Sequence, residues 1–197
     1  MIQGGSKSSV SASLAASRSA EWPIRTSEPE TASARCAHRL LQRCADLGIG
    51  FMSGVPCSFL AALFAALEQS VPGIAYYPAP REDVALGFAA GCYLAGGLAA
   101  VALQNSGLGH TVNPLTSLHR VYRIPVLLIV GWRGREPAQD APEHRYMGPA
   151  TPALLRDLGV RYVTASRATI GACVNQVAPV LHAAELAAIL VPPGVLD

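Results

Sequence analysis

The chain has 197 residues, which is about the length of one compact domain with a tail. Its 15 Lys and Arg against 13 Asp and Glu leave a formal net charge of only +2, so the composition favours neither a nucleic-acid-binding arm nor a polybasic membrane patch. Charged residues make up 14% of the chain and apolar residues 51%, and this apolar surplus predicts a subunit that covers part of its surface with a partner.

Residues 1–34 form a segment rich in Ser, Ala and Thr without apolar periodicity. This composition predicts a disordered, low-complexity tail, followed by one domain over residues 35–197. An organelle transit peptide is the alternative, because residues 1–20 hold Lys7 and Arg18 and no acid. The segment lacks the apolar stretch of a secretory signal.

From residue 31 onward, helical and strand-like patterns alternate along the chain. Helices are predicted by apolar residues at helical spacing, and strands by short apolar runs between turn residues. We predict helices over residues 31–47, 58–70, 82–95, 106–122, 151–158 and 168–183, and strands over 49–52, 74–77, 99–103, 125–131, 160–163 and 186–191. A polar loop over residues 132–149 is expected to connect the strand at 125–131 to the helix at 151–158.

This alternation predicts an α/β fold, a single doubly wound domain with a mostly parallel sheet of about six strands. The strands are nearly continuous apolar runs, as in sheets that helices cover on both faces. The helix at 82–95 is apolar all round, so we expect it to be buried on all sides, in part at a subunit interface.

An uncharged run from Val84 to Leu103 is long enough to span a bilayer. Its composition favours a buried helix and strand instead, because the run is mostly Ala and Gly and is divided by Gly96 and Gly97. We therefore expect no membrane-spanning segment and no membrane partner.

The reactive residue types exclude several kinds of site. Lys7 is the one lysine and lies in the tail, so the domain has neither a Schiff-base lysine nor a phosphate-loop lysine. The five cysteines form no Cys-x-x-Cys pair, which predicts a reducing, cytoplasmic environment. The five histidines lack zinc-binding spacing, so we expect no metal site made by this chain alone.

Glu82 opens the helix at 82–95 and shares a face with Leu86 and Ala89. Burial raises the pKa of a carboxyl, whereas a helix N-terminus lowers it. Two interpretations remain open from the spacing. Glu82 either caps its helix or pairs with Arg81, or it is an acid that shares a proton with a buried ring nitrogen.

Ligands of open parallel sheets bind beyond the carboxyl ends of the strands, where we place residues 54–58, 80–83, 104–109 and the loop that contains His144. The Gly-x-Gly at 107–109 lacks the remaining features of a dinucleotide fingerprint, and on its own it predicts a tight turn. His144 follows Glu143 in the long charged loop, and a solvated surface histidine and a functional one are both open there.

Five sequence blocks in these regions resemble thiamine-diphosphate-dependent 2-oxo acid decarboxylases. In particular, they resemble the pyrimidine-binding half, or separate alpha subunit, of phosphonopyruvate and sulfopyruvate decarboxylases. The blocks are GVPCSFL (54–60), REDVALGFAAGCYLAGG (81–97), QNSGLGHTVNPLTSL (104–118), IPVLLIVGWRG (124–134) and EHRYMGPAT (143–151). They follow the order of the family, and the resemblance extends over residues 36–194.

The resemblance implies thiamine diphosphate as cofactor and a role for each of seven residues. Glu82 aligns with the glutamate that shares a proton with the pyrimidine ring and thereby favours the imino tautomer that activates the thiazolium. Pro56, Glu82, Gln104, Asn105 and Gly107 are implied to bind the cofactor, Ser58 and His144 the substrate, and Glu82 and His144 are implied to be catalytic.

Two positions depart from the family pattern, since His110 and Arg81 each replace a common asparagine. The chain also lacks the Gly-Asp-Gly motif with a downstream Asn that holds Mg²⁺ and the diphosphate in this family. The resemblance therefore implies a beta subunit that supplies Mg²⁺ and the diphosphate site, within a hetero-oligomer.

The implied activity is decarboxylation of a small anionic 2-oxo acid: phosphonopyruvate to phosphonoacetaldehyde, or sulfopyruvate to sulfoacetaldehyde, with release of CO2. Either anion needs a cationic pocket, and the candidates are Arg81, Arg120, Arg123, Arg133, Arg135 and Arg145. The alternative is a non-catalytic binding or assembly subunit of such a complex.

Overall fold

The computed structural model describes residues 31–136 and 140–197. The helices are α1 (Ala32–Asp46), α2 (Ala61–Glu68), α3 (Glu82–Leu94), α4 (Leu108–Pro114), α5 (Met147–Asp157) and α6 (Ile170–His182), with short helices η1 (Ser58–Leu60), η2 (Asn105–Gly107), η3 (Leu115–Arg120) and η5 (Pro142–His144). The strands are β1 (Ile49–Gly54), β2 (Ala75–Pro78), β3 (Leu98–Gln104), β4 (Val126–Gly131), β5 (Arg161–Thr164) and β6 (Leu186–Val191). Of the tail predicted for residues 1–34, residues 1–30 lie outside the described residues, whereas Thr31 caps α1 and residues 32–34 belong to that helix.

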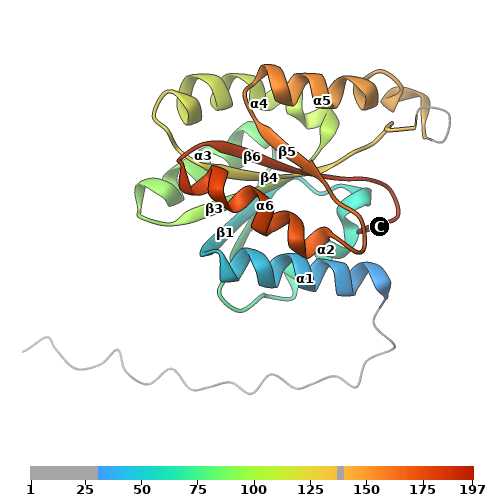
Figure 1. Cartoon of the computed structure of the whole chain (residues 1–197), viewed down its shortest axis with the longest axis horizontal. Coiled ribbons are helices and arrows are strands. Elements are labelled where there is room, and N and C mark those ends of the chain that lie inside the picture. The colour runs from blue at the N-terminus through green and yellow to red at the C-terminus, as the bar shows by residue number, and fades with distance from the viewer. Residues whose placement is uncertain (1–30, 137–139) are drawn as a thin grey trace, which may run out of the picture.

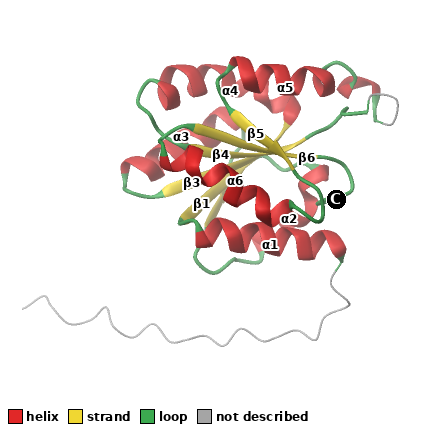
Figure 2. Ribbon diagram, in the orientation of Figure 1, coloured by secondary structure: helices red, strands yellow, loops and turns green. Residues whose placement is uncertain are grey.

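The six strands form one parallel sheet in the order β2-β1-β3-β4-β6-β5, and helices lie on both of its sides (Figure 2). The α/β prediction is confirmed. β4 and β6 are buried along their whole length, as their continuous apolar runs predict. The edge strands β2 and β5 are mostly exposed, so the expectation of burial on both faces is wrong for them.

Two helical layers cover the sheet (Figure 1). α1, α2 and α6 pack on one face, where the core includes Leu40, Leu63 and Val174. α3, α4 and α5 pack on the other face, over a core that includes Leu86 and Leu108. Each such side chain contributes roughly 1.5–3 kcal/mol on burial, so the two layers hold the sheet rigidly beneath its loops.

Local sequence signals set the helix boundaries. Thr31 caps α1 by accepting a hydrogen bond from the Ala34 N–H at 3.0 Å. α5 begins at Met147 rather than at the predicted residue 151. Pro152 within it has no N–H to donate to the carbonyl of Gly148, and that carbonyl instead accepts a hydrogen bond from Trp132 Nε1 at 2.8 Å.

The neighbouring strands β1 and β3 send their following helices to opposite faces, α2 to one and α4 to the other. Such a divergence opens a crevice at the carboxyl edge of the sheet. The segments 54–58 and 104–109 follow these two strands and therefore lie on its two sides, at the carboxyl ends of strands where the sequence places them.

The uncharged run from Val84 to Leu103 forms most of α3 and β3, separated by a turn at Gly96 and Gly97. Among the residues that the structure describes, no helix has the length and apolar character needed to cross a membrane.

Candidate active site

Glu82 stands at the N-terminus of α3 and is only 8% exposed. Leu86 and Ala89 on the same face are fully buried, so the helix carries the carboxyl down toward the core. Arg81 is not its partner, because the Arg81 guanidinium binds the neighbouring Asp83 at 2.8 Å.

The polar contact of Glu82 comes from a second helix. Glu82 Oε2 lies 2.7 Å from Nδ1 of His110 in α4. The other oxygen, Oε1, makes no hydrogen bond within residues 31–136 and 140–197 and lies against Gly107. This arrangement leaves one carboxyl oxygen held and the other available to a ligand.

The short helix η2 connects the two sides of the site. Gly107 at its end contacts the Glu82 carboxyl, whereas Asn105 at its start faces the opposite way and is fully buried. Asn105 Nδ2 donates to the Arg133 carbonyl at 2.8 Å and to Thr151 Oγ1 at 2.9 Å, and Oδ1 accepts from the Arg133 N–H at 3.1 Å. The Asn105 side chain thus fixes the turn that presents Gly107.

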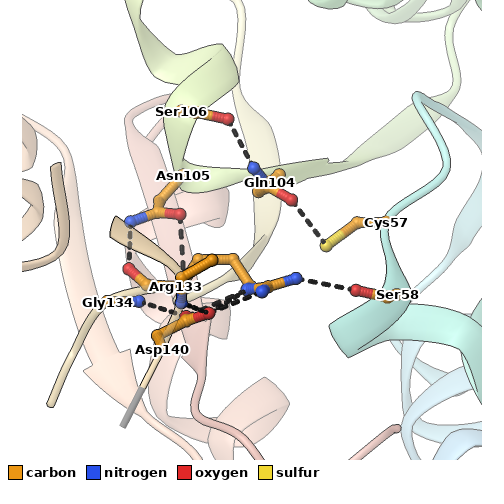
Figure 3. Close-up of polar contacts among 9 residues, drawn as sticks. Cys57, Ser58, Gln104, Asn105, Ser106, Arg133, Gly134 and Asp140 are labelled. Atoms are coloured by element: carbon orange, nitrogen blue, oxygen red, sulfur yellow. Dashed lines mark hydrogen bonds and ion pairs between the residues drawn. The ribbon is translucent and has the colours of Figure 1, made fainter. Parts of the chain in front are cut away.

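Arg133, which follows β4, forms a clamp that links Ser58, after β1, to Asp140 (Figure 3). Its Nη1 donates to Ser58 Oγ at 2.9 Å, and its Nε and Nη2 bind Asp140 at 2.9 and 2.5 Å. Asp140 also accepts the N–H groups of Gly134 and Ala141. These donors hold the pKa of Asp140 well below its usual range, and Asp140 in turn raises the pKa of Arg133.

Gln104, the last residue of β3, points toward Cys57 in the loop after β1 (Figure 3). Its Oε1 accepts from Cys57 Sγ at 3.6 Å, and its Nε2 donates to Ser106 Oγ at 2.6 Å. Burial raises the pKa of the Cys57 thiol, which therefore stays protonated at neutral pH and serves as a donor.

Pro56 and His144, two further residues named from the sequence, lie in loops at this edge. Pro56 is exposed in the turn after β1. His144 is half-buried in η5, and its carbonyl packs so tightly on Gly134 that a Cβ there would come within 2.0 Å of it. No hydrogen bond joins the His144 ring to another part of the described chain, and its catalytic and substrate-binding role stays a prediction.

The structure brings Ser58, Gln104, Asn105, Gly107 and Glu82 into one connected site. Sequence reasoning missed the residues that organise it. In the sequence, His110 is a departure from the family pattern, and Arg133 is one of several arginines without a distinguishing signal. The pairing of Arg133 with Asp140 had one signal in the sequence, an acid within the same loop, whereas the contact of Thr151 with Asn105 had none.

An apolar groove of about 600 Å³ runs along the outer side of α3, lined by Phe51, Tyr77, Gly87, Phe88, Gly91 and Cys92. Phe88 is 42% exposed, and Leu94 on the same helix is 77% exposed. The expectation that α3 is buried on all sides is therefore not met among the described residues, which cover the face of Leu86 and Ala89 and leave Phe88 and Leu94 exposed.

No three His, Cys, Asp or Glu side chains lie close enough together to hold a metal ion in residues 31–136 and 140–197. The site at the carboxyl edge is built from the Glu82 carboxyl with His110, the amides of Gln104 and Asn105, and the ion pair of Arg133 with Asp140.

A family model described as "Thiamine pyrophosphate enzyme, N-terminal TPP binding domain" matches residues 34–151. The chain belongs to this family. The matched region of the thiamine pyrophosphate enzyme domain contains Glu82, Gly107 and His110 together with the clamp of Arg133 and Asp140.

Curated relatives of this thiamine pyrophosphate enzyme domain include decarboxylases of two kinds. Phosphonopyruvate decarboxylase of Streptomyces viridochromogenes is 45% identical over 109 residues, which are 55% of this chain and 27% of that protein. Sulfopyruvate decarboxylase subunit alpha of Methanothermobacter thermautotrophicus is 40% identical over 119 residues, which are 60% of this chain and 71% of that subunit. The match thus spans about a quarter of the phosphonopyruvate enzyme but most of the sulfopyruvate alpha subunit.

A solved structure of 2-oxoglutarate:ferredoxin oxidoreductase from Magnetococcus marinus has the same fold, with a TM-score of 0.67 and 15% sequence identity. The superposition covers 88% of this chain and 32% of the oxidoreductase chain. At this identity, the likeness supports the fold of the thiamine pyrophosphate enzyme domain and nothing about its function.

Proposed function

We propose that this chain is the alpha subunit of a two-chain decarboxylase that acts on phosphonopyruvate or sulfopyruvate and binds the pyrimidine ring of thiamine diphosphate. One observation carries the proposal. The family's matched region holds a buried carboxyl, Glu82, whose Oε1 faces no partner in the described chain and is approached by Gly107. The names of the relatives supply the substrate class.

The residues at this edge fit the ring of the cofactor. Oε1 of Glu82 is available to a ring nitrogen, and the missing side chain of Gly107 leaves a cradle beside it that a Cβ would fill. When bound, thiamine diphosphate supplies the electron sink for the electron pair left by CO2. Glu82 holds or gives up one proton at Oε1. Because the carboxyl is buried, a hydrogen bond between Oε1 and the ring nitrogen of the cofactor would be stronger than in water.

The other proposed contacts follow the crevice. Gln104 and Pro56 border it, and Asn105 shapes the η2 turn through its bonds to Arg133 and Thr151. Ser58 receives a hydrogen bond from Arg133, which orients its hydroxyl for the substrate. We propose His144 as a further substrate contact and proton carrier from its place in the loop after β4.

The positions of the six candidate arginines reduce the number that could bind the anionic group of the substrate. Arg120 and Arg123 precede β4 and therefore lie at the amino end of the sheet, away from the site. Arg81 and Arg133 are each neutralised by an aspartate. Two candidates remain in the loop after β4, Arg135, which stacks on Trp132, and the exposed Arg145, and we propose that one of them binds the phosphonate or sulfonate.

A second chain completes the proposed enzyme. The described residues offer no cluster of metal ligands, so we place Mg²⁺ and the diphosphate on a beta subunit. Two observations support this. Relatives of similar length are named as alpha subunits, and the exposed apolar groove on α3 lies on the helix that carries Glu82.

The test is to assay CO2 release from phosphonopyruvate and sulfopyruvate with thiamine diphosphate and Mg²⁺, using this chain alone, a beta chain alone, and the two together. We expect activity only from the pair. Glu82→Gln should lower kcat at least ~100-fold, whereas Asp83→Asn, on the next residue of the same helix, should leave it within about 2-fold.

Three results contradict the proposal. Full activity of the lone chain would place the whole site on it. Equal rates of the beta chain with and without this chain would make it an assembly subunit. Full activity of Glu82→Gln in the complex would remove the proton-sharing role of Glu82.

A further inference from the structure

Glu82 and His110 form a hydrogen-bonded pair between two helices. Glu82 Oε2 and His110 Nδ1 are 2.7 Å apart, with the Glu82 side chain 11% exposed and the His110 side chain 58% exposed. A carboxyl nearly cut off from water thus contacts a ring that water reaches.

The pair has two ways to hold its proton. When Glu82 is ionised, His110 Nδ1 carries the hydrogen and donates it to Oε2. When Glu82 is protonated at Oε2, Nδ1 is the acceptor and the hydrogen on the ring lies on Nε2. A proton that leaves Oε2 for Nδ1 is balanced by the loss of the proton on Nε2 to water, so the ring can carry a proton between Glu82 and solvent.

Among the described residues, the ionisable groups around this pair are held by other partners. β1 and β3, against which α3 packs, contain none, and α4 contains only His110. Asp83 beside Glu82 is paired with Arg81. His119 reaches α3 from η3, but both of its ring nitrogens contact backbone carbonyls, those of Leu86 and Ile124.

We infer that His110 is a positioning residue that fixes Oε2 of Glu82 and exchanges the proton of that carboxyl with solvent. The inference rests on the proposed function, in which Glu82 acts by sharing a proton. It assigns separate tasks to the two carboxyl oxygens, since Oε2 is held by His110 while Oε1 remains for the ring nitrogen of the cofactor.

The first test measures the Glu82–His110 hydrogen bond directly and does not depend on an active enzyme. The ring nitrogen NMR signals of His110 in the full-length chain should show a hydrogen on Nδ1, because the carboxylate oxygen 2.7 Å away accepts it. Glu82→Gln should change the tautomer ratio, and Asp83→Asn should leave it unchanged. A ring with its hydrogen on Nε2 in the unmodified chain would overturn the inference.

The second test separates proton exchange from mere support of the helix. In the assembled enzyme, His110→Ala should lower kcat at least ~10-fold with a smaller change in the KM for the 2-oxo acid. Added imidazole should restore most of the loss, since the exposed position admits a small molecule. His110→Asn should keep the hydrogen bond without the exchange and should not respond to imidazole. The control is Asn113→Ala, at an exposed position of α4, which should behave as the unmodified enzyme.

The outcomes distinguish this inference from the proposed function. An unmodified complex that releases no CO2 from either substrate contradicts the proposed function, and the tautomer measurement then still decides whether the Glu82–His110 pair exists. An active complex in which His110→Ala keeps full kcat, or loses it without any response to imidazole, contradicts the exchange role of His110 alone.

Discussion

Gly107 lies so close to the carboxyl of Glu82 that a Cβ on residue 107 would stand 2.2 Å from Oε1 and 2.5 Å from Cδ. The backbone of Gly107 has φ of −70°, a conformation open to any residue. The requirement for glycine is therefore steric and is set by the acid rather than by the turn.

Gly107→Ala should displace the Glu82 carboxyl and lower kcat of the assembled enzyme by roughly 100-fold, because misplacement by about 1 Å has an effect of that size. Gly109→Ala is the matched control in the same turn, where a Cβ would meet nothing within 4 Å. Steady-state kinetics of the two variants check this, and equal activities would show that the carboxyl can move without loss.

The pair of Arg133 and Asp140 should make the stability of the chain depend on pH. Because the pKa of Asp140 is depressed in the folded state, the pair contributes fully above the unfolded value of about 3.9 and is lost as pH falls through the folded value. Asp140→Asn should lower the free energy of unfolding by roughly 1.5–3 kcal/mol at pH 7, and this difference should shrink below pH ~4.

Urea unfolding of the full-length chain and of Asp140→Asn at pH 7 and pH 3 measures the loss of stability in the variant and its decrease at low pH. The control is Asp46→Asn, whose pair with Arg43 is about half exposed on both sides and should change stability by less than ~0.5 kcal/mol. A difference between Asp140→Asn and the unmodified chain that is the same at both pH values would contradict the assignment.

Most helices and strands could be predicted from the sequence because their signals are local. The apolar run of β4 and the helical spacing after Glu82 need no knowledge of the rest of the chain. The exposure of β2 and β5 could not be read in this way, since it depends on the order of strands in the sheet. The early start of α5 was hidden by two prolines. Pro149 lies in the first turn, where no backbone N–H is needed, and the Gly148 carbonyl left free by Pro152 accepts its hydrogen bond from the distant Trp132.

In the candidate site, too, the residues with local signals could be predicted and the residues that depend on tertiary packing could not. Glu82 and the loop of Gln104 to Gly107 follow from strand ends and from the family resemblance. The partner of Glu82 does not, because His110 reaches it only through the packing of α4 on α3. Of the two residues that depart from the family pattern, His110 thus contacts the central acid, whereas Arg81 binds Asp83.

Asn105 should contribute to stability far more than its size suggests. Its amide is fully buried and bonds the main chain of Arg133 and the hydroxyl of Thr151. Asn105→Ala leaves buried groups without partners, at about 1–3 kcal/mol each, and should lower the urea midpoint clearly. Asn113→Ala at an exposed position is the control, and equal midpoints for the two variants would show that Asn105 is dispensable to the turn.

The apolar face of α3 should be needed for assembly and not for folding. Leu94 is 77% exposed, so Leu94→Lys removes little buried area from the chain itself and should leave its urea midpoint nearly unchanged. In a complex that covers this face, the charge would be buried without a partner, which is strongly unfavourable. We expect the affinity for the beta subunit to fall at least ~10-fold in a titration that follows complex formation. Val121→Lys, at a position 65% exposed beyond η3, should assemble normally. Unchanged affinity of Leu94→Lys would place the interface elsewhere.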